Sequence, residues 1–138
     1  MKGMKRANII PTMKYHDAPA AIEWLCRAFG FEKQMVVEGE GGRIDHAQLK
    51  LGDAMIMLGS FRGNEYEKRV RTPQDVGGFC TQSAYLVIDD VDAMYASAKA
   101  AGAEIYQELQ EPDYGGKFFG CVDPEGQIWN FGSYDPWA

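Results

Sequence analysis

The chain has 138 residues, of which 46% are hydrophobic and 25% are charged, and this is enough for one globular domain with a core of its own. Its net charge of −6 argues against a nucleic-acid partner, because binding to phosphates requires a basic face. The same charge is compatible with a neutral or cationic small ligand.

The cysteines and the apolar runs indicate the cellular compartment. Cys26, Cys80 and Cys121 are scattered without C-x-x-C spacing, which predicts reduced thiols and not a disulfide or zinc framework. The chain has no apolar run of membrane-spanning length, and no apolar stretch follows the basic residues 1–6 as it would in a signal peptide. We therefore expect a cytoplasmic protein without a membrane partner.

The first half of the chain predicts one strand, one helix and three more strands. Residues 8–15 form the expected first strand, where Pro11 is tolerated only at an edge. Asp17 is placed to cap the following helix, and Gly30 to end it. Apolar residues recur between them at helical spacing, at Ile22, Leu25, Cys26 and Phe29. The later strands are expected over residues 31–38, 44–51 and 54–58.

Residues 61–79 are polar, charged and rich in turn formers, and they show no clear periodicity. A segment this long and irregular is usually functional or mobile. We interpret it as a solvated linker within a single domain. Module one then covers about 8–60, the linker 61–80, and module two about 81–134.

The second half repeats the pattern of the first. Asp89 or Asp90 caps a helix that Gly102 ends. When the first half is slid onto the second, Asp17 falls on Asp89 and Gly30 on Gly102. The strands and the closing hairpin are expected over residues 81–88, 103–109 and 117–131. The chain is therefore predicted to contain two βαβββ modules.

The closing hairpin turns at residues 123–126, an Asp-Pro-Glu-Gly string. Proline presets φ at the second turn position, and Gly126 takes a backbone conformation that a Cβ would resist. Strand alternation then places Trp129 and Phe131 on one face, against a helix, and Asn130 on the other.

This hairpin resembles the last hairpin of the glyoxalase/bleomycin resistance protein/extradiol dioxygenase (vicinal oxygen chelate) superfamily, in its small bacterial glyoxalase-like branch. The strings at 17–22, 46–47 and 131–137 are similar to that branch as well, so the resemblance covers about 8–134. It implies an α+β fold in which two βαβββ modules form a cupped mixed β-sheet, an open barrel, with the helices on the outside. It also implies a ligand in the concave face and a homodimer, since members usually build their pockets with a partner's help.

The resemblance further gives the positions at which metal-dependent members hold a divalent ion. Here these positions carry Ile10, Met57, Gln82 (or Ser83 if the register slips by one) and Asn130. None is a histidine or a carboxylate, whereas protein sites for Mg, Mn, Ni, Zn and Fe are built from imidazole, carboxylate or thiolate donors. We therefore expect no metal and no other cofactor.

His46 lies on the predicted concave face, and imidazole, with an unperturbed pKa of about 6.5, is a side chain suited to proton transfer. No second histidine or acid stands at ligand spacing, so we expect a hydrogen-bonding wall residue and keep a catalytic role as the alternative. His16 is expected to be structural or exposed. Strand alternation predicts further ligand-binding residues on this face at Ile10, Thr12, Gln48, Met57, Gln82, Phe118, Gly120 and Asn130.

Three functions remain open. The first is a metal-free small-molecule binding protein of the bleomycin-resistance type, and a cationic glycopeptide antibiotic would suit the acidic chain. The second is a metal-dependent lyase or isomerase, or a dioxygenase, of the same superfamily. The third is a cofactor-free enzyme that uses His46.

Overall fold

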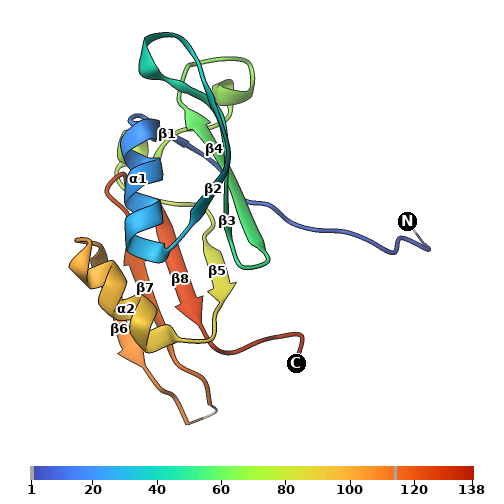
Figure 1. Ribbon diagram of the computed structural model, residues 1–138, viewed down its shortest axis with the longest axis vertical. Coiled ribbons are helices and arrows are strands. Elements are labelled where there is room, and N and C mark those ends of the chain that lie inside the picture. Colours follow the sequence, from blue (N-terminus) through green and yellow to red (C-terminus); the bar gives the residue numbers. More distant parts are fainter. Residues whose placement is uncertain (1, 114) are drawn as a thin grey trace.

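The computed structural model describes residues 2–113 and 115–138, which form two modules stacked along the longest axis of the molecule (Figure 1). Module one consists of β1 (Thr12–Tyr15), α1 (Ala18–Phe29), β2 (Glu32–Glu38), β3 (Ile44–Leu51) and β4 (Ala54–Ser60). Module two consists of β5 (Ala84–Val87), α2 (Val91–Ala100), β6 (Glu104–Gln110), β7 (Phe118–Val122) and β8 (Ile128–Gly132). Three short 3-10 helices are η1 (Glu40–Gly42), η2 (Tyr66–Lys68) and η3 (Pro73–Val76).

The two modules have the same topology. Each forms a four-stranded mixed sheet, with strand orders β1-β4-β3-β2 and β5-β8-β7-β6. In each sheet the first pair is parallel and the other two are antiparallel. Both helices lie on the same side of the molecule, at the left in Figure 1. The α+β fold with two βαβββ modules is therefore confirmed, and its strands form two sheets instead of one continuous sheet.

Both helices begin at an aspartate that the sequence marks. Asp17 accepts through Oδ1 from a backbone N–H of the first turn of α1 at 3.1 Å, and Gly30 ends that helix in the left-handed conformation at φ 81°. In α2 the cap is Asp90, whose Oδ1 accepts from the first turn at 3.0 Å, so aligning Asp17 with Asp89 was wrong by one residue at this point. Within the described residues, neither α1 nor α2 has the length and apolar composition of a membrane-spanning helix.

The first strand is shorter than the sequence predicts. It begins at Thr12 instead of residue 8, and residues 4–11 form an arm that leads away from the sheets (Figure 1). Pro11 explains this boundary, because proline has no N–H to donate to a neighbouring strand. Its carbonyl still accepts from the backbone N–H of Met57 at 2.9 Å.

The modules share one core between their helix-covered sheet faces. The Phe29 ring, at the end of α1, lies 5.4 Å from the Trp129 ring and 4.8 Å from the Phe131 ring of β8. The helices are also joined directly, since Trp24 Nε1 donates to the backbone carbonyl of Ala101 at 2.8 Å. These contacts fix the placement of the two sheets relative to each other.

The turn of the closing hairpin fastens module two to module one. The buried Asp123 carboxylate accepts from the Tyr15 hydroxyl of β1 at 2.6 Å and from Trp129 Nε1 at 3.1 Å. The Glu125 carboxylate accepts from the backbone N–H groups of His16 at 2.7 Å and Asp17 at 2.8 Å, where α1 begins. The turn therefore acts as a clamp between the modules.

Candidate ligand-binding faces

The sheet of module one turns one face to α1 and leaves the other uncovered. The strand register places Thr12, Met57 and Gln48 in one row across β1, β4 and β3. His46 is two residues from Gln48 on the same face, and its Nε2 lies 2.9 Å from Gln48 Oε1. Gln48 in turn donates to Gln34 Oε1 at 2.6 Å. We call this surface open face one, with Thr12, Lys14, Met35, Val37, His46, Gln48 and Met57.

The sheet of module two is uncovered in the same way. Its register places Tyr85, Asn130 and Gly120 in one row across β5, β8 and β7, with Gly132 beside Phe118 in the next. Neighbouring side chains of β8 lie on opposite sides of the strand, as predicted. Trp129 is buried against module one, and Asn130 lies on the other side. We call this surface open face two, with Tyr85, Val87, Tyr106, Phe118, Gly120, Asn130 and Gly132.

The side-chain amide of Asn130 is engaged within the chain. Its Oδ1 accepts from the Tyr106 hydroxyl, and its Nδ2 donates to Ser83 Oγ at 3.0 Å and to the Ala84 carbonyl at 3.1 Å. With both amide hydrogens used, Asn130 positions the Tyr106 ring. Burial raises the pKa of Tyr106 and Tyr85, so both hydroxyls stay protonated at neutral pH.

The register also revises the four positions carried over from metal-dependent relatives. Thr12 is the β1 residue paired with Met57, whereas Ile10 lies in the arm before the strand. The helix caps Asp17 and Asp90 are equivalent positions in the two modules. The same separation along the chain relates Thr12 to Tyr85 and Met57 to Asn130. Tyr85 and Asn130 are paired in module two. These four side chains contain no imidazole and no carboxylate, so their chemistry does not suit a divalent metal.

The predicted ligand-binding residues are divided between the two sheets of the chain. Thr12, His46, Gln48 and Met57 belong to open face one, and Phe118, Gly120 and Asn130 belong to open face two. Gln82 is exposed ahead of β5, where its neighbour Ser83 makes the contact with Asn130. Two clefts among the described residues lie elsewhere and are lined by other residues. One, of about 500 Å³, lies at the start of α2 beside Asp90, Asp92 and Lys117, and one of about 330 Å³ lies along residues 61–76.

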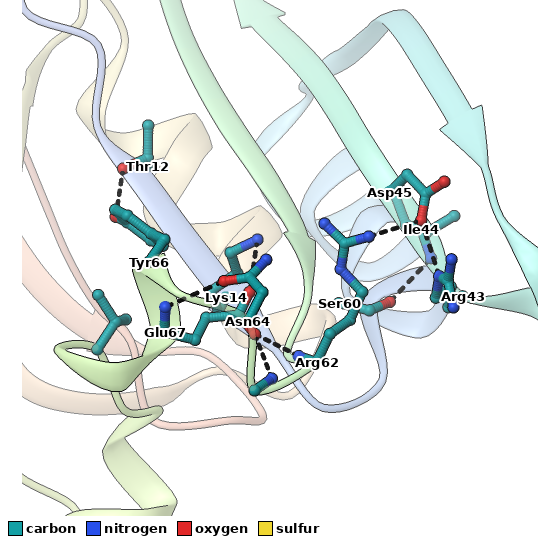
Figure 2. Close-up of polar contacts among 12 residues, drawn as sticks. Thr12, Lys14, Arg43, Ile44, Asp45, Ser60, Arg62, Asn64, Tyr66 and Glu67 are labelled. Atoms are coloured by element: carbon teal, nitrogen blue, oxygen red, sulfur yellow. Dashed lines mark hydrogen bonds and ion pairs between the residues drawn. The ribbon is translucent and has the colours of Figure 1, made fainter.

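The segment between the modules contributes a buried acid that the sequence did not reveal (Figure 2). Glu67 is only 1% exposed, and its Oε1 accepts from the backbone N–H groups of Arg62 and Gly63. Its Oε2 lies 3.1 Å from the Lys14 ammonium of open face one. Burial opposes ionisation of Glu67, yet the two N–H groups and Lys14 together lower its pKa. Glu67 therefore anchors this segment to β1, while most residues of the segment remain exposed to solvent.

A second polar cluster in Figure 2 fixes the start of this segment to module one. Arg43 Nε and Arg62 Nη1 both donate to Asp45 Oδ1, at 2.8 and 3.1 Å. Nearby, the buried Ser60 hydroxyl accepts from the backbone N–H of Ile44 at 2.8 Å. These contacts hold the chain where it leaves β4. They do not involve the central row of open face one (Thr12, Met57 and Gln48) or that of open face two (Tyr85, Asn130 and Gly120).

The remaining titratable and nucleophilic side chains of the described residues lie apart from the two open faces' rows of paired residues. Within residues 2–113 and 115–138, no three His, Cys, Asp or Glu side chains gather as they would around a metal ion. All three cysteines are free, and burial raises the pKa of the Cys121 thiol to about 12, which keeps it unreactive. His16 pairs with Asp75 at 2.7 Å in an exposed contact, as expected for a structural histidine.

Comparison with known proteins identifies the relatives of this chain. A sequence model described as the Glyoxalase/Bleomycin resistance protein/Dioxygenase superfamily matches residues 12–131. The crystal structure of TioX from Micromonospora sp. ML1 is similar with a TM-score of 0.72 and 30% identity, covering 91% of this chain and 94% of TioX. The bleomycin-binding protein of Streptomyces verticillus, solved with copper(II)-bleomycin, has a TM-score of 0.64 and 21% identity, covering 96% and 99%. The uncharacterized protein Mb0911c of Mycobacterium bovis is 29% identical over 91% of this chain and 84% of its own length. The chain therefore belongs to the Glyoxalase/Bleomycin resistance protein/Dioxygenase superfamily.

Proposed function

We propose that the protein binds a small molecule on its two open faces without the help of a protein-bound metal. The observation that carries this proposal is the composition of these faces. They combine exposed apolar and aromatic side chains, such as Met35 at 45%, Tyr85 at 43% and Tyr106 at 48% exposure, with the hydrogen-bonding groups of His46 and Gln48. Apolar walls with few polar groups are typical of small-molecule sites.

The enzymatic alternatives of the superfamily receive less support. A metal-dependent lyase, isomerase or dioxygenase needs imidazole or carboxylate ligands, and the central rows carry Thr12, Met57, Tyr85 and Asn130 instead. A cofactor-free enzyme would use His46 as acid or base. Its hydrogen-bond partner is the amide of Gln48, which, unlike a carboxylate, does not stabilise a protonated imidazole by charge.

We further propose that the working form is a homodimer, in which a second copy lies over the open faces. The expected wall residues are divided between the two faces, four on open face one and three on open face two, and large hydrophobic side chains of both faces are exposed in the single chain. The bleomycin-binding protein of Streptomyces verticillus shares the fold, which supports a bound ligand of that general kind. The ligand would then be enclosed between the sheets of two copies.

A thermal-shift screen tests the binding proposal. Metal-free bleomycin and copper(II)-bleomycin are the first probes, followed by a broad collection of small molecules. A ligand present at 100 times its Kd should stabilise the protein by about 2.7 kcal/mol and raise Tm by several degrees. Met57→Arg places a charge on open face one and should abolish the shift, whereas Asp53→Arg, in the exposed β3–β4 turn, should retain it.

Two results would contradict the proposal. One is a screen in which no compound shifts the Tm of the wild-type protein. The other is a shift that Met57→Arg leaves intact. Light scattering should give twice the 15.4 kDa chain mass, and a monomer at all concentrations would refute the homodimer.

A further inference from the structure

Two tyrosines of open face two lie along the sheet surface, and each covers a glycine. Tyr106 begins on β6, and the hydroxyl end of its ring lies over Gly120 of the neighbouring β7. Tyr85 begins on β5, and the hydroxyl end of its ring lies over Gly132 of the neighbouring β8. A Cβ on either glycine would overlap the ring above it. Glycine within a strand marks such a close approach.

Hydrogen bonds hold both rings in this position. The Tyr106 hydroxyl donates to Asn130 Oδ1, and the Tyr85 hydroxyl donates to the backbone carbonyl of Tyr134 at 2.8 Å. Each ring is thus fixed at both ends, by its own strand and by its hydroxyl. Little side-chain freedom is left to lose when a ligand binds, which favours affinity.

The rings are placed to receive a flat partner. Although the hydroxyl end of each ring is held against the sheet, Tyr85 and Tyr106 remain 43% and 48% exposed, so a large part of each aromatic side chain is open to a ligand. Aromatic faces stack favourably on other planar π systems. The stacking energy depends little on which substituents the ligand carries at the edge of its ring. The net charge of −6 disfavours an anion.

Building on the proposed function, we propose that open face two stacks a planar aromatic ring system of a neutral or cationic ligand on Tyr85 and Tyr106. Asn130 acts here as a positioning residue that holds the Tyr106 ring, and Gly120 and Gly132 provide the space in which the rings lie.

Isothermal titration of the full chain with two monocations tests this assignment. Proflavine is planar and aromatic, whereas amantadine carries the same charge on a saturated cage. The wild-type protein should bind proflavine at least about tenfold more tightly than amantadine. Gly120→Ala leaves both rings in the chain and displaces only Tyr106, and it should weaken proflavine binding about tenfold. Tyr106→Leu should weaken proflavine binding by the same factor. The double variant should bind proflavine about as weakly as either single variant.

Phe79→Leu is the matched control, because Phe79 is an exposed aromatic at 76% that lies outside both open faces. It should leave proflavine binding unchanged. Equal binding of the two monocations, or unchanged proflavine binding in Tyr106→Leu, would overturn the assignment. So would a change of oligomeric state in Gly120→Ala or Tyr106→Leu that accounts for their loss of binding, because Tyr106 would then hold the two copies together instead of contacting the ligand. If a non-planar compound binds and proflavine does not, only this assignment fails, whereas a wild-type protein that binds nothing refutes the proposed function as well.

Discussion

Trp129→Ala is expected to lower the free energy of unfolding by about 3–5 kcal/mol. Trp129 is 1% exposed, and its ring lies 5.4 Å from Phe29 and 5.8 Å from Phe31, both of module one. Removing the indole leaves a cavity where the two modules meet. It also removes the Nε1 donor to Asp123. Urea denaturation followed by circular dichroism measures the loss.

The neighbouring Asn130→Ala provides the control. Asn130 lies on the other side of β8 and contributes hydrogen bonds at a partly exposed site, so its loss should cost about 1 kcal/mol. Similar costs for the two variants would mean that the strand does not separate a core face from a ligand face. The assignment of both open faces would then be wrong.

Asp123→Asn is expected to cost about 2–4 kcal/mol, although it changes one atom. The carboxylate accepts four hydrogen bonds, two at Oδ1 from the backbone N–H groups of Glu125 and Gln127 and two at Oδ2 from Tyr15 and Trp129. An amide has only one oxygen, so its NH₂ group must face donors in a buried site. Burial raises the pKa of Asp123, and the four donors oppose that rise by stabilising the charged form.

The denaturation midpoint of Asp123→Asn should fall while the slope with urea stays the same. Asp53→Asn is the matched control, because Asp53 occupies the β3–β4 turn of module one and is exposed. It should change stability by less than about 0.5 kcal/mol. A midpoint for Asp123→Asn equal to that of wild type would show that the turn does not clamp the modules.

Local chemistry explains what the sequence predicted well. Asp17 and Gly30 mark the ends of α1 because a side-chain acceptor and a left-handed residue satisfy backbone groups within a few residues. The placement of Trp129 and Asn130 follows from strand alternation alone. Such signals do not depend on the rest of the chain.

Tertiary contacts explain what the sequence missed. Glu67 stands among other charged residues of the segment, and nothing local marks its contacts with the distant Lys14 and with the backbone N–H groups of Arg62 and Gly63. The separation of the two open faces likewise depends on how Phe29 packs against β8, which no local pattern encodes. One signal was present but unused. Gly120 lies within β7 and Gly132 ends β8, and glycine in a strand indicates close approach by another group.

The metal content of the protein tests the metal-free binding proposal most directly. The chain should be purified without chelators from medium that contains Zn, Ni, Mn and Fe, and each metal measured against protein by elemental analysis. Because Thr12, Met57, Tyr85 and Asn130 occupy the central rows, we expect well below one metal ion per chain. A value near one ion per chain, retained after gel filtration, would contradict the proposal and favour a metal-dependent enzyme.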